Sequence, residues 1–257
     1  MSRSKIVLLA GPGISTRVLY HALKDEFEID HIILEAPVSK KQLIFRRIKK
    51  LGLLTVIGQV FFQLMVVNLL NFFSASRKKQ ILTTENLHDM EIPAEKITQV
   101  SSVNDDRCLE LIQTLDPQLV VVNGTRIISE RILLATAATF INMHAGITPA
   151  YRGVHGAYWA LVNGDAEHCG VTVHLVDAGI DTGAIIGQAL IQPTSTDNFV
   201  TYPLLQLSAG IPLMRSAIRS IQQQQQLQTN ISSAASRLWS HPGFLQYCYY
   251  RFFRGIK

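Results

Sequence analysis

Three side chains between residues 142 and 181 are of the types needed to transfer a group to an amine. Asn142 and His144 are separated by one residue, and Asp181 follows in a glycine-rich segment. An asparagine amide can donate a hydrogen bond to an oxygen that becomes negative. A histidine can donate as well, or it can take a proton from an attacking amine. An aspartate close to that histidine would orient its ring and raise its basicity. Each residue alone has an ordinary structural explanation, so the prediction depends on their joint spacing.

Several short segments surround these residues in a defined order. They are Gly124-Thr125-Arg126-Ile127-Ile128, Asn142-x-His144, Pro149-x-Tyr151-Arg152-Gly153, Gly170-Val171-Thr172-Val173-His174 and Asp177-x-Gly179-x-Asp181-Thr182-Gly183. Together they resemble the formyltransferase family, which includes methionyl-tRNA formyltransferase, glycinamide ribonucleotide transformylase and the sugar N-formyltransferases. The resemblance is loose over residues 5–35 and close over about 97–192. No single segment is specific, and their order and spacing carry the resemblance.

The resemblance implies a catalytic set of Asn142, His144 and Asp181, with 10-formyltetrahydrofolate as cosubstrate. We expect folate in a cleft between two segments, with cofactor-binding residues Gly124, Thr125, Arg126, Ile127, Ile128, Val176, Asp177 and Gly179. Arg126 has two interpretations, a partner for a ligand carboxylate or a structural salt bridge. The acceptor side is expected to use Tyr151, Arg152, Gly153 and His155. We predict no metal, because the four histidines between residues 144 and 174 lack the spacing of zinc ligands.

The elements that must position these residues alternate between strand and helix. Buried apolar runs predict strands at 5–10, 31–34, 97–100, 119–122, 139–142, 171–176 and 184–191. Helices are expected between them at 15–24, 105–115, 130–134 and 157–163, with Ser102 or Asn104 capping the second. This alternation predicts an α/β fold with a Rossmann-like, doubly wound, mostly parallel sheet. Ligands of such sheets bind at the carboxyl ends of the strands, where Gly124–Ile128 and Asn142–His144 would lie.

A nucleotide-binding oxidoreductase is a rival interpretation of the first strand and turn. Gly11-Pro12-Gly13 follows the strand, and Glu35 ends the second strand as a ribose-binding acid would. The third glycine of that fingerprint is missing, so we regard the signal as weak. An inactive binding protein on the same fold is the other alternative, and the intact Asn142, His144 and Asp181 argue against it.

Residues 36–80 interrupt the alternation as an apolar and basic insertion. Leu51 to Phe73 carries no charge over 23 residues, which is long enough to span a bilayer. It lies between strands of one expected sheet, however, and basic clusters flank both of its ends. We therefore expect one or two amphipathic helices that dock on the domain, on a second subunit of a homodimer or on a membrane surface.

Composition and charge place the chain among intracellular globular proteins with a large core. Hydrophobic residues make up 47% and charged residues 17%, with a formal net charge of +5. The basic residues cluster beside apolar segments, which favours a membrane surface or an anionic ligand over nucleic acid. An ordinary solvated basic face is the alternative. Three scattered cysteines without paired spacing indicate a reducing compartment, so we expect a cytoplasmic protein with membrane association as an alternative.

We expect the catalytic core at 1–192 and a helical C-terminal extension at 193–257. Gly210 and Pro212 would interrupt a helical stretch at 199–221, and an aromatic and basic tail follows from His241. A tRNA-acting member would be expected to have a larger C-terminal domain, and a purine-pathway member would be expected to lack the insertion. By elimination the acceptor is a small amine, an amino sugar carried on a nucleotide or a lipid. Another amine, such as a purine precursor or an aminoacyl-tRNA, is the alternative.

Overall fold

A seven-stranded, mostly parallel sheet organises the chain, as the sequence predicts. The computed structural model describes residues 4–230, 232 and 234–257. The strand order is β3 (Ile97–Val100), β2 (Ile29–Glu35), β1 (Ile6–Ala10), β4 (Leu119–Asn123), β5 (Thr139–His144), β7 (Gly170–Leu175) and β8 (Ile185–Leu190). The first five strands of that order run parallel, and β7 and β8 are antiparallel to their neighbours. The Rossmann-like fold class is confirmed.

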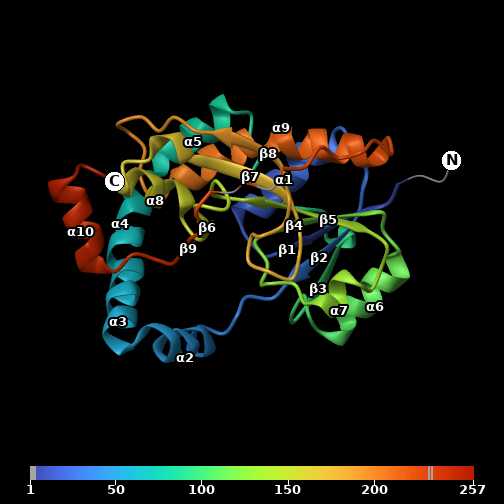
Figure 1. The fold of residues 1–257 in the computed structure, drawn as a ribbon, viewed down its shortest axis with the longest axis horizontal. Helices are drawn as coiled ribbons and strands as arrows, with labels where there is room; N and C mark the ends of the chain where they lie inside the picture. Colours follow the sequence, from blue (N-terminus) through green and yellow to red (C-terminus); the bar gives the residue numbers. More distant parts are fainter. Residues whose placement is uncertain (1–3, 231, 233) are drawn as a thin grey trace.

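Helices cover both faces of the sheet, which is why its central strands are apolar throughout (Figure 1). Ile6 and Leu8 of β1 face a core shared with α1 (Ile14–Lys24) and α9 (Tyr202–Gln222). Val7 and Leu9 face the opposite core, shared with α6 (Asp106–Leu115) and α7 (Glu130–Leu133). Period-2 alternation therefore divides one apolar strand between two cores.

The predicted cap of α6 is wrong by a few residues. Asp105 is the N-cap, and its side chain accepts a hydrogen bond from the Cys108 backbone N–H at 2.8 Å. Its other oxygen accepts from Ser101 and Ser102. A carboxylate can satisfy more donors at the positive end of a helix than the Ser102 or Asn104 side chains that we expected.

The predicted break near Gly210 and Pro212 is also wrong, because α9 runs unbroken from Tyr202 to Gln222. A Cβ atom on Gly210 would lie 2.6 Å from Sδ of Met143 on β5 and 3.0 Å from Cγ2 of Val171 on β7. The glycine therefore allows the helix to pack closely on the sheet. Leu207, Ile211 and Met214 of α9 belong to the same core as β1, so the extension is integral to the fold.

The insertion between β2 and β3 is mainly helical. It comprises α2 (Lys40–Leu51), α3 (Leu53–Phe61), a π-helical segment (Phe62–Val67), α4 (Asn68–Phe73) and α5 (Ala75–Thr84). Gly52 separates α2 from the next helix. Its φ of 84° is a backbone conformation that residues with a side chain rarely adopt. Leu53–Phe73 forms one 21-residue helix that is long and apolar enough to cross a membrane by those two criteria alone. It is termed the insertion helix below.

One face of the insertion helix packs on the rest of the chain. Phe62 is fully buried and contacts Phe199 and Tyr247, at ring centroid distances of 4.9 and 5.1 Å. Gln59 donates a hydrogen bond to the His241 carbonyl at 2.8 Å. These contacts join the insertion to α8 (Gly156–Val162) and α10 (Phe244–Phe253) in a third apolar core. Of the expected docking alternatives, this face of the insertion helix therefore docks on the domain itself. The opposite face is exposed.

Short elements complete the fold. Single turns of 3-10 helix lie at Ala94–Lys96 and Ala166–His168. β6 (Arg152–Gly153) pairs in parallel with β9 (Leu238–Trp239), so the C-terminal segment contacts the loop that follows β5.

Candidate active site

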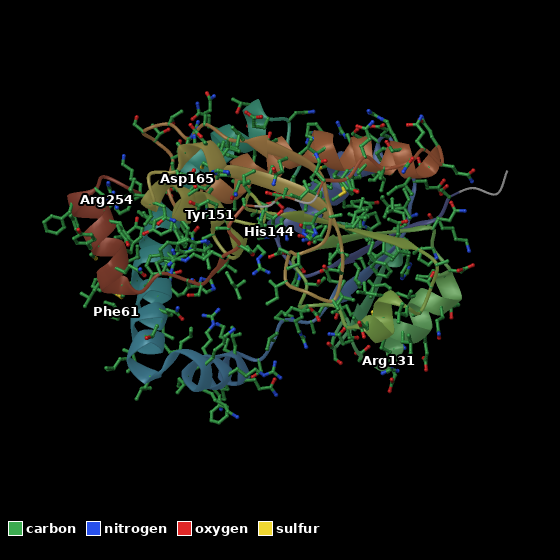
Figure 2. All side chains as sticks on the ribbon, viewed as in Figure 1. Phe61, Arg131, His144, Tyr151, Asp165 and Arg254 are labelled. Atoms are coloured by element: carbon green, nitrogen blue, oxygen red, sulfur yellow. The ribbon has the colours of Figure 1, made fainter. Side chains whose placement is uncertain are left out.

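A cavity of about 570 Å³ opens at the carboxyl ends of β4 and β5. Asn142 and His144 of β5 line it, together with Asp181 from the loop between β7 and β8. This edge of a parallel sheet is the usual ligand site of the fold class. His144 lies near the centre of the molecule, whereas Phe61 and Arg254 lie at one side of it (Figure 2). The three predicted catalytic residues are thus brought together from two elements 37 residues apart in sequence.

Asn142 is held by His174, its partner across the antiparallel pair of β5 and β7. The His174 Nδ1 faces the Leu175 carbonyl at 2.7 Å, so this nitrogen carries the proton. The Nε2 atom is then an acceptor, and the Asn142 Nδ2 amide donates to it at 3.1 Å. This contact fixes which end of the Asn142 amide is nitrogen. Its second N–H stays available for an oxygen in the cavity.

His144 is buried, and both of its ring nitrogens face oxygen atoms of the chain. Nε2 lies 2.8 Å from the Tyr151 carbonyl and must donate, because a carbonyl only accepts. Nδ1 lies 3.3 Å from Oδ2 of Asp181. Gly146 makes room for this arrangement, since a Cβ atom there would lie 2.2 Å from the Tyr151 carbonyl oxygen. Nδ1 is therefore the nitrogen that can take up a proton.

Asp181 lies between two histidines and a backbone amide. The Gly153 N–H donates to its Oδ2 at 3.0 Å, and Nε2 of His174 lies 3.8 Å from its Oδ1. The residue has a left-handed backbone, at φ 51°, which aspartate tolerates better than most residues. The glycine-rich segment thus delivers one carboxylate into the cavity wall.

The electrostatics of the pair favour a charged aspartate and a neutral histidine. Burial lowers the pKa of His144, and the opposing effects of Asp181 and the Tyr151 carbonyl do not reverse it. Burial acts to raise the pKa of the Asp181 carboxyl, but interactions with His174, His144 and the Gly153 N–H hold this pKa below its ordinary value. At neutral pH the site therefore holds a carboxylate beside an unprotonated imidazole.

All eight residues predicted to bind the cofactor line the cavity. They are Gly124, Thr125, Arg126, Ile127, Ile128, Val176, Asp177 and Gly179. Of its two interpretations, the Arg126 side chain takes the structural one: its Nε lies 3.1 Å from Oε1 of Glu35, and its Nη2 donates to the Ala36 and Ser101 carbonyls. Ligand contact by these residues stays a prediction.

Glu35 does not fit the rival interpretation as a ribose-binding acid. It is 4% exposed, and its two oxygens accept hydrogen bonds from the Val103 and Arg126 backbone N–H groups. These bonds fix the turn after β4, so the carboxylate serves the cavity wall.

Only one of the four residues predicted to bind the acceptor lines the cavity. Gly153 lines the cavity, but Tyr151, Arg152 and His155 do not. The Tyr151 hydroxyl donates to Asp165, and the Arg152 Nη1 donates to the Ile180 carbonyl. His155 packs against Phe199 and faces His241, with 2.8 Å between Nε2 and Nδ1. These three side chains contact other parts of the chain, and acceptor contact by them stays a prediction.

Other lining residues were missed by the sequence analysis. Ser15 of α1 and Pro203, Gln206 and Leu207 of α9 all face the cavity. The α9 residues lie 20 or more positions beyond the last family-like segment, which ends at Gly183, in a helix whose pattern indicates only core packing. His174 of β7 lies beside both Asn142 and Asp181, so the structure adds it to the candidate site.

Within the described ranges, no group of three or more His, Cys, Asp or Glu side chains is arranged to hold a metal ion.

Comparison with known proteins agrees with this geometry. The family model described as "Formyl transferase" matches residues 68–203, which is more than half of the chain. A methionyl-tRNA formyltransferase from Thermodesulfovibrio yellowstonii is 35% identical over 106 residues, covering 41% of this chain and 34% of that protein. One from Nitratiruptor is 28% identical over 199 residues, covering 77% and 53%. The matches thus span between about a third and a half of these curated relatives.

Solved structures show the same fold at low sequence identity. A sugar N-formyltransferase from Shewanella has a TM-score of 0.56 and 16% identity, covering 91% of this chain and 76% of its own. A phosphoribosylglycinamide formyltransferase from Streptococcus pneumoniae has a TM-score of 0.55 and 18% identity, covering 85% and 98%.

Proposed function

Because the chain belongs to the formyl transferase family, we propose that it transfers a formyl group from 10-formyltetrahydrofolate to the primary amine of a small acceptor. The observation that carries this proposal is the constellation of Asn142, His144, His174 and Asp181 at one wall of the cavity. It supplies an oxyanion donor and a proton acceptor within one site.

The cavity fits a folate in size and in lining. Its volume of about 570 Å³ lies within the range of small-molecule sites. The backbone of Gly124–Ile128 can meet the polar edge of a pterin, and Ile127 and Ile128 supply an apolar wall. The bound cosubstrate would contribute an activated formyl carbon.

The Asn142 amide acts on the formyl oxygen. As an amine attacks a carbonyl carbon, negative charge grows on that oxygen, and a fixed N–H donor stabilises the charge. His174 already holds one amide hydrogen, so the donor is oriented before the acceptor binds. Preorganisation of this kind spares the cost of reorienting the amide during the reaction.

His144 and Asp181 act on the proton that the amine must lose. Nδ1 of His144 is unprotonated at neutral pH and adjoins the carboxylate. A proton taken at Nδ1 forms an ion pair with Asp181, which can pass it on to water. Nε2 stays bonded to the Tyr151 carbonyl throughout and keeps the ring in place.

For the acceptor we propose an amino sugar carried on a nucleotide or a lipid. The printed names of similar structures include sugar N-formyltransferases, and the insertion adds a surface beyond the sheet that a compact transferase would not need. The curated relatives are methionyl-tRNA formyltransferases, so an aminoacyl-tRNA is the second candidate.

We further propose a division of labour along the chain and a reducing compartment. Residues 1–192 would carry the transfer chemistry, with the insertion at 36–80 and the extension at 193–257 serving the acceptor side. Cys108 and Cys169 are buried free thiols, and burial raises the pKa of each to about 12, so neither is reactive. Free cysteines of this kind suit the cytoplasm.

Mass spectrometry of candidate acceptors incubated with enzyme and 10-formyltetrahydrofolate tests the proposal. Nucleotide-linked amino sugars are expected to gain one formyl group, and methionyl-tRNA serves as the competing acceptor. Formylation of the tRNA alone would replace the sugar. A panel without any formylated product, from enzyme that also fails to bind folate, would overturn the transfer activity itself.

A further inference from the structure

The charges of the chain are segregated in sequence and in space. Residues 36–84 contain nine lysines and arginines and no aspartate or glutamate. Residues 198–257 contain six basic residues and again no acidic one. The insertion and the C-terminal helix lie on the same side of the molecule in Figure 1. The insertion and the C-terminal helix therefore bring two segments without acidic residues to the same side of the molecule.

The insertion helix exposes an apolar stripe on this region. Its outward residues recur at helical spacing, and Leu54 and Phe72 are 85% and 77% exposed. The stripe consists of Leu53, Leu54, Ile57, Phe61, Leu64, Met65, Leu69, Phe72 and Phe73. The opposite residues, Val56, Gln59 and Phe62, are buried against the rest of the chain. A helix with one face packed and the other apolar face exposed is presented to something outside the chain.

Neighbouring elements add exposed apolar and basic side chains beside the insertion helix. Phe45 of α2 is 71% exposed, and α2 also carries Lys49 and Lys50 in its last turn. Phe252 and Phe253 of α10 are each 79% exposed, beside Arg251 and Arg254. Phe61 of the insertion helix packs edge-on against Phe244 of α10, with 4.7 Å between ring centroids. Apolar and aromatic side chains flanked by basic ones are typical of a helix that lies in a membrane interface.

The fold argues against a single membrane crossing by the insertion helix. β2 ends at Glu35 before the insertion and β3 begins at Ile97 after it, and both strands pair in one sheet. A single crossing would separate them. The packed face and the Gln59 hydrogen bond to His241 also hold the helix against the body of the chain.

Two other occupants fit the charges or the apolar stripe less well. A second copy in an isologous dimer would bring two basic, acid-free surfaces together, and like charges would repel. RNA would match the charge but would leave the aliphatic stripe in contact with polar groups. An anionic bilayer satisfies both features, since it offers negative headgroups above an apolar layer.

We propose that α2, the insertion helix and α10 form a docking surface for an anionic phospholipid bilayer. The apolar stripe enters the boundary between headgroups and acyl chains, and the surrounding lysines and arginines contact the headgroups. This inference does not depend on the proposed acceptor, because it concerns a surface outside the cavity.

Vesicle flotation of the full chain tests the docking surface. Binding is expected to vesicles of equal parts phosphatidylcholine and phosphatidylglycerol, with little binding to phosphatidylcholine alone. Raising the salt to about 0.5 M should weaken the interaction, because ions screen the headgroup charge. Lys49→Gln with Lys50→Gln is expected to reduce the affinity about 25-fold, at about fivefold for each charge.

Substitutions on the stripe separate the apolar contribution from the charge. Leu54→Glu with Phe72→Glu should reduce vesicle affinity at least tenfold, because placing a charged side chain in an apolar layer is unfavourable. Leu134→Glu is the matched control, because Leu134 is 82% exposed but follows α7, away from the proposed surface. Circular dichroism verifies that all variants fold, which is expected since each site is exposed.

Three outcomes would overturn the inference. The stripe variants could bind vesicles as well as the wild type does. The wild type could form a lipid-free dimer that the stripe variants dissociate, with no vesicle binding. It could also bind tRNA and ignore vesicles. Loss of vesicle binding in the stripe variants alone, with the Leu134 variant unaffected, supports the docking surface whether or not any formyl acceptor is found.

Discussion

Asn142 donates one amide hydrogen to His174, which leaves the other for an oxygen in the cavity. Replacing it with alanine removes the oxyanion donor and leaves the fold intact, because the side chain is only half-buried. We expect Asn142→Ala to lower kcat by about 10²–10³ with a much smaller change in the acceptor KM. Steady-state formylation kinetics measure both. Asn230→Ala, at an exposed asparagine, is the control. A loss seen only in KM would show that Asn142 binds the ground state and does not stabilise the transition state.

The pH dependence of the reaction reports on His144. Since protonated His144 cannot accept the amine proton, kcat/KM should fall as the pH drops through the pKa of His144. Burial lowers that pKa, so the acidic limb is expected below pH 6.5. Asp181→Asn removes a charge that raises the pKa, so it should move the limb to still lower pH as well as slow the reaction. Profiles of kcat/KM against pH for the wild type and Asp181→Asn test this prediction. An unmoved limb would assign it to another group.

The sequence predicts which three side chains meet at the cavity but does not predict what their neighbours contact. The types and spacing of Asn142, His144 and Asp181 constrain the chemistry, because an amide, an imidazole and a carboxylate have few alternative uses together. Tyr151 contributes its backbone carbonyl to His144, and its side chain points elsewhere. The amino-acid sequence cannot show that a residue contributes through its backbone carbonyl and not through its side chain. The structural role of Arg126 likewise depends on Glu35, which lies 91 residues away.

At the scale of elements, α9 depends on one close approach to the sheet. Gly210→Ala would place a Cβ atom 2.6 Å from the Met143 sulfur, so the helix or β5 must shift. We expect a loss of about 1–3 kcal/mol in the free energy of unfolding, from overpacking. Gly58→Ala is the matched control, because it is also a helical glycine but meets nothing nearer than 3.8 Å. Helix propensity predicts that this control gains up to about 1 kcal/mol. Denaturant unfolding measures both. Equal effects in the two variants would remove the packing argument for Gly210.

The strands and most helices could be predicted from hydrophobic periodicity, whereas the unbroken course of α9 could not. Glycine and proline usually end helices, and the sequence gives no sign that Gly210 faces β5 and β7. The packing of Leu207 and Ile211 against the sheet outweighs the local propensity. The insertion shows the same limit, since its apolar content predicts helices but not which face of them packs on the chain.

At the scale of the whole molecule, a half-buried histidine pair joins the loop before α8 to the C-terminal segment. Nε2 of His155 lies 2.8 Å from Nδ1 of His241, which also faces the Gln63 amide of the insertion helix at 3.0 Å. Burial, reinforced by the neighbouring charges, lowers the pKa of His155 to about 3 and that of His241 to about 4. Three parts of the chain that are distant in sequence thus meet at two neutral imidazoles.

This pair predicts acid sensitivity of the whole fold. Because the folded-state pKa values lie below the unfolded value of about 6.5, protons bind the unfolded state more strongly. The stability from this pair is fully present above pH 6.5 and is lost as the pH falls toward 4 and then 3.

His155→Asn removes one titrating ring, and asparagine tolerates the left-handed backbone at φ 60°. We expect the fall in unfolding free energy between pH 7 and pH 4 to be smaller in this variant, by on the order of a few kcal/mol. Urea unfolding at the two pH values measures the difference, with His88→Asn, at an exposed histidine, as the control that should keep the wild-type difference. The same fall in the His155 and His88 variants would mean that other groups drive the acid unfolding.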